Sequence, residues 1–404
     1  MKILFLTLVP FKDIYRRSIY IDLVRELANR GVEVYVVCPR QRREQLSTEL
    51  IHYGKIHILY VKTGNITNTK SFIEKGISTI KIEGQYLRAI KQYFADVKFD
   101  LVMYSTPPIT FNRVLKYLKG RYNVQTYLML KDIFPQNAVD IGLIHRHGLL
   151  RRYFRNKEIK LYKNSDVIGG MSQGNVDYIL TNNPYLENNK VEIFPNSIKP
   201  IERKKEKVKN MEILNKYGIP EDKTLFVYGG NLGKPQGVEF LIEVAGNFVN
   251  VKNGHLLIVG NGTEYNTIER YLQTYKTANV SLFKKLPKDE YDKLVDSADV
   301  GLIFLDKRFT IPNIPSRLTS YMENSLPILA ATDPNTDLKN ILEESKSGFW
   351  CESGNLSEFI AASKKLANDT LLREKMGRNG RDYLEKYFDV TNTVDILLKH
   401  MYKG

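Results

Sequence analysis

The feature that most constrains the fold is an alternation of short apolar runs with amphipathic segments along almost the whole chain. Residues 2–9 (KILFLTLV) form a continuous run of mainly apolar residues, the pattern of a parallel strand that is covered on both faces. The segment after it spaces Ile19, Leu23 and Leu27 along one face of a helix, and Gly31 follows as a helix-ending residue. Runs of both kinds continue in turn, so the sequence predicts an α/β fold built from doubly wound parallel sheets.

The chain is expected to form two domains. Its 404 residues exceed the size of one ordinary hydrophobic core, and residues 199–209 (KPIERKKEKVK) interrupt the alternation with a run of charge. We therefore predict two Rossmann-like domains, residues 1–197 and 198–384, and a C-terminal helical segment, residues 385–404. The apolar start of the chain is short and charged residues follow it at once, so we expect a buried strand there and not a signal peptide.

The net charge of +15 is concentrated in the first half of the chain. Residues 1–196 carry 30 Lys and Arg against 17 Asp and Glu, a net of +13. This asymmetry suggests that the first domain meets a polyanion: an anionic lipid surface, a pyrophosphate-linked lipid or nucleic acid. Charge that only keeps exposed helices in solution is the alternative. Cys38 and Cys351 lie far apart and form no metal or disulfide pattern, which suits a reducing cytoplasm.

Residues 309–331 are expected to form a loop, a short helix and a buried strand. Ser316 follows two prolines and is expected to cap a helix that begins at Arg317. The free N–H groups and positive dipole end of a helix start suit a phosphate, and Arg317 adds a permanent charge with two parallel donors. This stretch predicts an anion site in the second domain.

Two glycine-rich turns in the same domain strengthen that prediction. Residues 228–237 (YGGNLGKPQG) and 259–264 (VGNGTE) each connect a strand-like run to a helix-like run. Glycines let the backbone approach a phosphate closely, although neither spacing fits the dinucleotide fingerprint or the Walker loop. Each turn taken alone could be an ordinary tight turn, but three anion-friendly turns in one domain favour phosphate binding.

These motifs, together with residues 286–305 and 314–330, occur in the order seen in family 4 glycosyltransferases, which the chain resembles over nearly its whole length. Residues 128–144 (LMLKDIFPQNAVDIGLI) and 195–197 (PNS) resemble a bacterial subgroup that builds capsule, O-antigen and exopolysaccharide units and includes N-acetylfucosamine transferases. The resemblance implies a GT-B fold, with two Rossmann-like domains facing across a cleft. It also implies a nucleotide-sugar donor, usually a UDP-sugar, in the second domain, an acceptor in the first, retention of configuration, no metal cofactor, and a last helix that packs back on the first domain.

The resemblance assigns donor binding to the glycine turns and to the helix that begins at Arg317. Asn231 and Gln236 stand where many relatives have Arg and Lys, which leaves Arg317 as the main cation for the diphosphate and Lys234 as a nearby reserve. The full set of predicted donor-binding residues is Gly229, Gly230, Asn231, Gly233, Lys234, Gln236, Gly260, Gly262, Glu264, Leu286, Ser316, Arg317, Ser320 and Glu323.

The chain departs from the family where the donor's ribose is normally bound. Ser320 occupies the position of a ribose-binding Glu, and Glu323 lies one helical turn further on and could replace it. Leu286 and its neighbours are expected to frame the base through backbone groups. The identity of the donor sugar is left open by this departure.

Lys131, Asp132 and Arg317 are the catalytic candidates. Lys131 stands where many relatives have a His beside the donor sugar, and Asp132 is kept. A carboxylate at this strand end could orient the acceptor hydroxyl or act as its base. The alternative is that the Asp132 side chain caps the turn that follows.

Other residues of the first domain are candidates for contact with the acceptor or a membrane. Thr106 follows a predicted strand, and Arg16 or Arg17 could contact an acceptor diphosphate, close the cleft, or simply be solvated. Residues 145–163 can form an interfacial helix with an apolar stripe beside basic side chains, or an ordinary helix whose stripe is core. The stripe comprises Leu149, Leu150, Tyr153, Phe154, Ile159 and Tyr162, and the basic residues are Arg151, Arg152, Arg155, Lys157 and Lys160.

The expected protein is a cytoplasmic enzyme, peripheral on the inner face of the bacterial membrane, that takes a nucleotide sugar and a lipid-linked oligosaccharide. No nucleic-acid partner is expected, because no recognition motif accompanies the basic segment. No metal site is expected, because the six histidines show no ligand spacing. The rival hypotheses are an epimerase-like GT-B enzyme and a basic lipid- or nucleic-acid-binding module with a decayed donor site.

Overall fold

The computed structural model describes residues 1–66, 72–203 and 208–401, with side chains from residue 81 onward in the second range. The chain divides into two compact units, Met1–Lys199 with Val390–Gly404, and Pro200–Asp389. The predicted boundaries lay at 197/198 and 384/385, a few residues before the observed ones. Among the described residues, no helix combines the length and the apolar character that a membrane span requires.

The first unit contains one eight-stranded sheet with the order β3-β4-β2-β1-β5-β6-β7-β8. All neighbouring strands are parallel except β3, which runs antiparallel to β4 as the edge of the sheet. The sequence analysis did not predict the β3–β4 hairpin, whose turn holds Gly54 at φ +60°. The strands are β1 (Lys2–Leu6), β2 (Glu33–Gln41), β3 (Glu49–Tyr53), β4 (Ile56–Thr63), β5 (Leu101–Ser105), β6 (Gln125–Leu130), β7 (Val167–Gly170) and β8 (Val191–Ile193).

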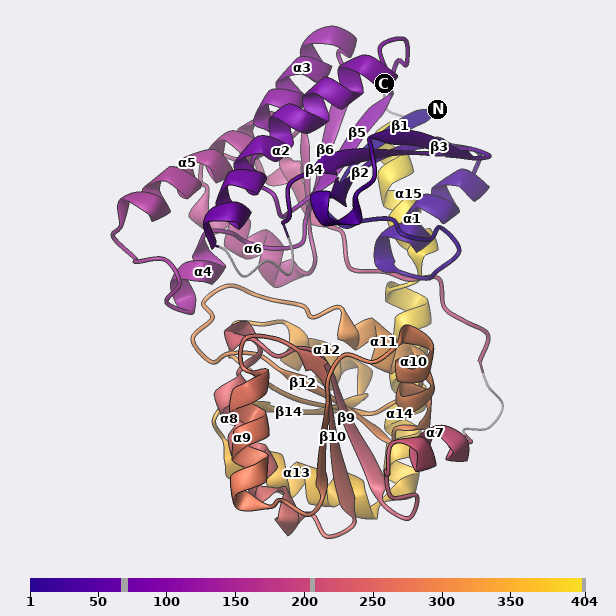
Figure 1. The fold of residues 1–404 in the computed structure, drawn as a ribbon, viewed down its shortest axis with the longest axis vertical. Coiled ribbons are helices and arrows are strands. Elements are labelled where there is room, and N and C mark those ends of the chain that lie inside the picture. The colour runs from indigo at the N-terminus through magenta and orange to yellow at the C-terminus, as the bar shows by residue number, and fades with distance from the viewer. Residues whose placement is uncertain (67–71, 204–207, 402–404) are drawn as a thin grey trace. The chain divides into compact units, whose positions relative to one another are not determined.

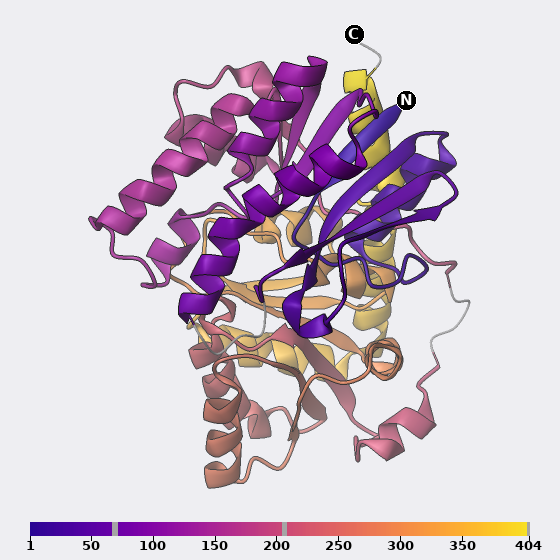
Figure 2. The same ribbon diagram turned by 45° about the horizontal axis from the view of Figure 1, so that its top comes forward.

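The helices of this unit form two groups. In one, α3 packs between α2 and α5, and the three lie side by side in both ribbon views (Figures 1 and 2). In the other, α1 packs against α15, and their apolar side chains share one core cluster with β1 and β2. The helices are α1 (Ile19–Asn29), α2 (Phe72–Tyr93), α3 (Asn112–Tyr122), α4 (Gln136–Asp140), α5 (Leu149–Asn164), α6 (Gln173–Asn182) and α15 (Val390–Met401), with one-turn 3₁₀ helices η1 (Arg42–Glu44) and η2 (Asn188–Lys190).

The C-terminal helix α15 belongs to the first unit although it follows the whole second unit in sequence. Val394 and Leu397 are completely buried in the core cluster of the first unit. Polar contacts add to this packing, because the Ser197 and Thr393 hydroxyls lie 2.7 Å apart and His400 Nε2 lies 2.8 Å from Glu192 Oε1.

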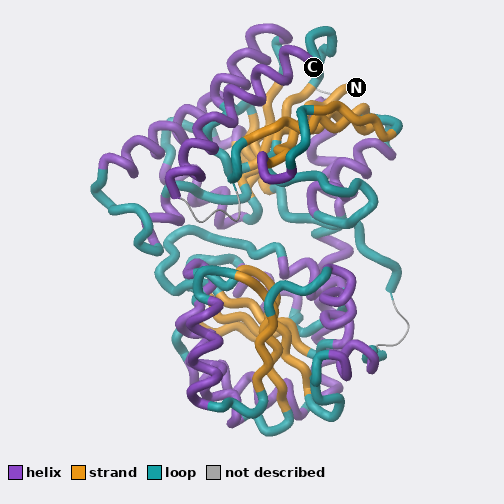
Figure 3. The backbone as a smooth tube through the Cα atoms, in the orientation of Figure 1, coloured by secondary structure: helices purple, strands orange, loops and turns teal. Residues whose placement is uncertain are grey.

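The second unit contains a six-stranded, fully parallel sheet with the order β11-β10-β9-β12-β13-β14. Figure 3 shows the strands in orange and the helices in purple. Both units are therefore doubly wound α/β structures, as predicted. The strands are β9 (Thr224–Asn231), β10 (Gly254–Asn261), β11 (Val280–Phe283), β12 (Val300–Phe304), β13 (Ile328–Thr332) and β14 (Gly348–Glu352). The helices are α7 (Met211–Lys216), α8 (Val238–Asn247), α9 (Tyr265–Tyr275), α10 (Lys288–Ser297), α11 (Arg317–Glu323), α12 (Leu338–Ser345), α13 (Leu356–Asn368) and α14 (Thr370–Tyr387), with 3₁₀ helices η3 (Lys234–Gln236) and η4 (Phe248–Asn250).

Candidate active site

The glycine turn after β9 lies directly against the arginine at the start of α11. Gly230 has φ +143°, a backbone conformation that side-chain-bearing residues rarely adopt. A Cβ atom at Gly230 would lie 3.0 Å from Nη2 of Arg317, and one at Gly229 would overlap the Tyr291 ring. The absence of side chains here lets the backbone and the guanidinium meet.

The second glycine turn, after β10, packs on the first. Leu232 donates from its N–H to the carbonyl of Asn261 at 3.0 Å, and the N–H of Glu264 donates to the carbonyl of Leu232 at 2.9 Å. A Cβ atom at Gly260 or Gly262 would lie about 2 Å from a backbone oxygen of the first turn. Close packing of the two turns therefore accounts for these two glycines without any phosphate.

Arg317 is the centre of this region. Its guanidinium stacks over the Tyr228 ring at 4.5 Å, and its Nη2 donates to Oε1 of Gln236 at 2.6 Å. Its Nη1 atom is buried and has no hydrogen-bond partner among the described residues. A buried cationic donor without an acceptor is costly, so this atom is suited to donate to an anionic ligand.

The predicted cap at Ser316 is wrong in its detail. The helix does begin at Arg317, but the Ser316 side chain makes no capping hydrogen bond. The reason is its backbone, which is already helical (φ −62°, ψ −18°) where a capping residue is normally extended. The Ser316 side chain is exposed.

The structure gathers most of the other predicted donor residues around the two turns. Asn231 and Lys234 are exposed and Gln236 is half-buried against Arg317. The segment at Leu286 is linked to the second turn, because the N–H of Lys285 donates to Oδ1 of Asn261 at 3.0 Å. Gly233 and half-exposed Glu264 complete the group.

Ser320 and Glu323, the two candidates for binding the ribose of the donor, make different contacts. Oε1 of Glu323 accepts from the N–H of Ile201 at 3.0 Å, at the start of the second unit. Ser320 lies one turn after Arg317 and is half-exposed. Glu323 is thus occupied in a contact with the backbone, while the Ser320 hydroxyl group makes no hydrogen bond among the described residues.

Three tyrosines of the site were missed by the sequence analysis. Tyr228 lies under the guanidinium, and the Tyr321 hydroxyl accepts from the N–H of Gly229 at 3.3 Å and donates to the carbonyl of Val227 at 3.2 Å. Burial raises the pKa of Tyr291 to about 12, although the Arg317 charge opposes this shift. Tyr228 directly precedes the glycine pair, but the sequence does not indicate which tyrosines surround it.

In the first unit, Thr106 joins two predicted residues. Its Oγ1 accepts from the backbone N–H of Lys131 at 3.0 Å and of Asp132 at 3.2 Å. The Lys131 ammonium donates to the carbonyls of Phe194 at 3.1 Å and Pro195 at 3.3 Å. Burial lowers the pKa of Lys131 to about 7.

Asp132 is positioned by the start of α4. Its Oδ1 accepts from Nδ2 of Asn137 at 2.5 Å. Burial raises the pKa of Asp132 to about 6, while the bonds from Asn137 and from the N–H of Ile133 act in the opposite direction. A pKa near neutrality suits a general base, and the same bonds also let this carboxylate fix the turn that follows it.

The remaining basic candidates of the first unit have different surroundings. Arg16 is exposed, with Nε 3.6 Å from Oδ2 of Asp13, and the Arg17 guanidinium donates to the carbonyl of Lys199. Arg155 is half-buried and donates to Glu158, to the carbonyl of Asn182 at the end of α6 and to the Asn183 side chain just after it. Its guanidinium is therefore engaged within the first unit, and its contact with an acceptor or a membrane stays a prediction.

The predicted apolar stripe of α5 is exposed at the start of the helix and buried near its end. Tyr162 is 1% exposed and belongs to the core, as the alternative hypothesis proposed. The first turns remain exposed, at 85% for Leu149, 54% for Leu150 and 48% for Tyr153. Arg152 is exposed beside them.

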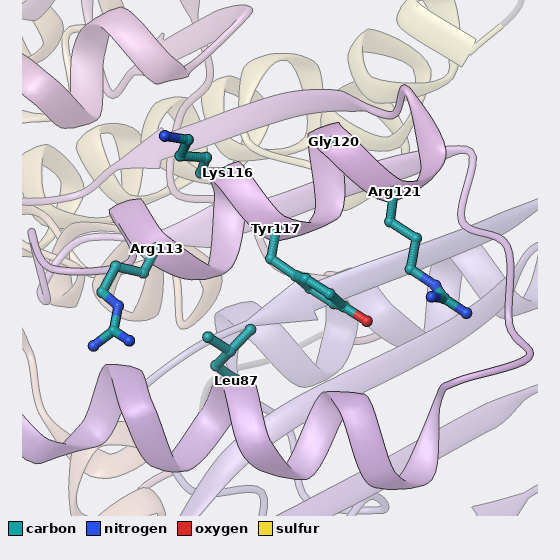
Figure 4. Close-up of a pocket in the computed structure, with 6 residues that line it drawn as sticks. All are labelled: Leu87, Arg113, Lys116, Tyr117, Gly120 and Arg121. Atoms are coloured by element: carbon teal, nitrogen blue, oxygen red, sulfur yellow. The ribbon is translucent and has the colours of Figure 1, made fainter.

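The excess charge of the first half gathers on α3 and α5. Every charged residue of α3 is basic, and α5 carries six basic residues against one Glu. A shallow groove of about 640 Å³ lies between α2 and α3, with Leu87 and Tyr117 in it. Figure 4 shows Arg113, Lys116 and Arg121 along this groove. In the described ranges, no three His, Cys, Asp or Glu side chains come together as a metal site would require.

Two family models match the chain. The one described as Glycosyltransferase Family 4 matches residues 19–201, and the one described as Glycosyl transferases group 1 matches residues 209–383. A probable glycosyltransferase of Pseudomonas aeruginosa, WbjE, is 22% identical over 293 residues, 70% of each chain. The capsular polysaccharide biosynthesis glycosyltransferase CapM of Staphylococcus aureus is 26% identical over 241 residues, 57% of this chain and 60% of that protein. The crystal structure of Anabaena HepE in complex with UDP has the same fold, with a TM-score of 0.68, 13% identity and coverage of 100% of both chains.

Proposed function

Because the chain belongs to the family 4 glycosyltransferases and has their GT-B fold, we propose that it transfers a sugar from a UDP-sugar to a saccharide acceptor in bacterial polysaccharide synthesis. The relatives support a role in polysaccharide synthesis, since CapM is described as a capsular polysaccharide biosynthesis glycosyltransferase. The structure of HepE in complex with UDP supports UDP as the nucleotide of the donor. Capsule, O-antigen and exopolysaccharide units are the products that we consider, with a hexosyl, N-acetylhexosaminyl or N-acetylfucosaminyl group as the transferred sugar.

The observation that carries this proposal is the unpartnered Nη1 atom of Arg317 beside the glycine turns. A diphosphate would supply the missing acceptor, and a guanidinium binds phosphate with two parallel hydrogen bonds. Transfer from a nucleotide sugar leaves negative charge on the departing diphosphate. Arg317 and the backbone of the Gly229–Gly233 turn would stabilise that charge, which lowers the barrier to reaction.

The acceptor half of the proposal is assigned to the first unit. Asp132 would accept a proton from the acceptor hydroxyl or orient it, with Lys131 beside it, and the transfer would retain the anomeric configuration without a metal cofactor. A lipid-linked acceptor would bring the protein to the cytoplasmic face of the membrane. The exposed Leu149, Leu150 and Tyr153 beside the basic helices support this location, since interfacial helices combine such residues.

The decisive experiment is UDP binding to variants of Arg317, measured by calorimetry. We expect Arg317→Ala to lose about 2 kcal/mol of binding free energy, roughly thirtyfold in Kd, and to lose transfer activity as well. Arg317→Lys keeps the charge and the alkyl stem but loses the fork of donors, so an intermediate loss is expected.

A matched control in the same unit is Arg378→Ala, because that guanidinium is exposed and lies 3.8 Å from Glu374. It should bind UDP as the unchanged protein does. Wild-type affinity in a folded Arg317→Ala variant would overturn the proposed donor site, and binding of UDP without any transfer would leave only a binding protein.

A further inference from the structure

A small pocket lies inside the first unit between α4, α5 and α6, separate from the glycine turns of the second unit. Its volume is about 200 Å³, and Ile133, Pro135 and Gln136 contribute one wall. Pockets that enclose drug-sized ligands measure roughly 300–1,000 Å³. This pocket, which we call the α5–α6 pocket, therefore suits a single sugar ring or a phosphate and is too small for a nucleotide.

One guanidinium of the α5–α6 pocket is held rigidly. Arg155 donates to Oε2 of Glu158 at 2.6 Å, to the carbonyl of Asn182 at 2.8 Å and to Oδ1 of Asn183 at 2.6 Å. The other oxygen of Glu158 accepts from the Tyr162 hydroxyl at 2.8 Å. Since all these groups line the pocket, its wall is ordered before any ligand enters.

Two further donors lie in the same wall of the pocket. Arg151 lies one turn before Arg155 on the same face of α5, and Tyr178 faces it from α6 across the pocket lining. Within the described part of the chain, neither the Arg151 guanidinium nor the Tyr178 hydroxyl makes a hydrogen bond or an ion pair. With one carboxylate, that of Glu158, against two guanidinium groups, the lining has an excess positive charge.

We propose that the α5–α6 pocket binds an oxyanion carried by a sugar, either the phosphate of a sugar phosphate or the carboxylate of a uronic acid. Arg151 and Tyr178 donate hydrogen bonds directly to the anion. Arg155, which is fixed by its own hydrogen bonds, attracts the anion through its positive charge. Burial raises the pKa of Tyr178 to about 12, so this hydroxyl stays protonated and able to donate at neutral pH. The inference deepens the proposed function, on which it relies for the ligand's role as part of the acceptor.

The position of the pocket supports a place beside the acceptor. Ile133 and Pro135 belong to the segment that follows Asp132, so a bound sugar would lie next to the chain that carries this carboxylate. Leu149 and Tyr153 are each two residues from Arg151, roughly 200° around a helix. The exposed apolar surface of α5 therefore faces away from the pocket, which favours a saccharide ligand over a lipid headgroup.

The test is calorimetric binding of glucose 1-phosphate, galacturonate, inorganic phosphate and uncharged glucose to the full chain without nucleotide. It uses the Arg317→Ala background, so that the donor site does not compete for phosphate. Glucose 1-phosphate or galacturonate, or both, should bind more tightly than glucose by at least tenfold. The tighter of the two identifies the source of the anion, and inorganic phosphate shows how much the sugar ring contributes.

Variants of single residues test whether the sugar anion binds in the α5–α6 pocket. Arg151→Gln should weaken the sugar anion at least tenfold and Tyr178→Phe about threefold. Arg152→Gln removes the same charge from an exposed neighbouring residue. Its Kd for the sugar anion should stay within twofold of the Kd of the parent protein, the Arg317→Ala variant. Failure of both sugar anions to bind, or equal losses in Arg151→Gln and Arg152→Gln, would overturn this inference. The proposed function would be untouched by that result, because UDP binding and transfer are measured separately.

Discussion

At the scale of single residues, the proposed donor site depends on how one cation, Arg317, is placed. Arg317 was predicted from its place at a helix start, and the structure confirms that α11 begins there. The helix cap was wrong, and the contacts that hold the guanidinium come instead from Tyr228 and Gln236. The amide oxygen of Gln236 accepts from Nη2 of Arg317, so this neutral side chain helps to position the guanidinium.

Asp132 gives a prediction for the pH dependence of activity. If its carboxylate is the base, kcat/KM should fall as the pH drops below about 6, the value to which burial raises its pKa. Asn137 stabilises the charged form, so Asn137→Ala should move this fall to higher pH, by about one unit for one net hydrogen bond. Asp132→Asn should lower the rate by about a hundredfold or more and remove the dependence. An unchanged profile in Asn137→Ala would argue against Asp132 as the titrating group.

The same group affects stability with a defined sign. Folding raises the pKa of Asp132 above its ordinary value, so the ionised carboxylate costs free energy in the folded state above pH 6. This cost disappears as the pH falls toward 4. Relative to Asp132→Asn, the unchanged protein should therefore be less stable at pH 8 than at pH 4, as measured by urea unfolding.

At the scale of elements, neighbouring segments have different roles. The two glycine turns pack on each other, so Gly260 and Gly262 serve the fold, while Gly229 and Gly230 admit the tyrosines and Arg317. Helix α5 divides in a similar way. One face, with Arg151 and Arg155, lines a pocket, and the exposed first turns add apolar side chains to the basic surface of the α2, α3 and α5 layer.

The basic layer predicts salt-dependent binding to anionic vesicles. Each Lys or Arg near a charged membrane contributes about 1 kcal/mol, so reversing two charges with Lys116→Glu and Arg121→Glu should weaken binding more than tenfold. The measurement is co-sedimentation with vesicles that contain phosphatidylglycerol, at low and high salt. Lys339→Glu reverses an exposed charge in the second unit and serves as the control. Equal binding by all three proteins would remove the α3 surface from the proposal.

At the scale of the whole molecule, the two ends of the chain belong to the same unit. Helix α15 follows the second unit in sequence, yet its buried Val394 and Leu397 complete the core around α1. The single tryptophan, Trp350, lies in β14 of the second unit and donates from Nε1 to the Thr332 hydroxyl at 2.8 Å. The two units can therefore be followed separately during unfolding.

Leu397→Ala should destabilise the first unit by 2–5 kcal/mol, the usual loss for a fully buried leucine. The unfolding transition followed by circular dichroism should acquire an earlier step, while the Trp350 fluorescence transition stays in place. Lys399→Ala, on the exposed side of the same helix, should change neither. A shift of the fluorescence transition by the same amount would show that the two units unfold together.

The sequence by itself determined the α/β class, the division into two units, their approximate boundaries, and where the glycine turns and Arg317 lie relative to the strands and helices. These follow from local patterns: unbroken apolar runs, helical spacing, glycines at strand ends and a charged break. Only the tertiary structure showed that Glu323 contacts Ile201, that Arg155 contacts Glu158, that three tyrosines surround Gly229 and that α4, α5 and α6 enclose a pocket. Each of these depends on which distant segments pack together, and side-chain contacts between segments are set by the three-dimensional arrangement of the elements and not by spacing along the chain.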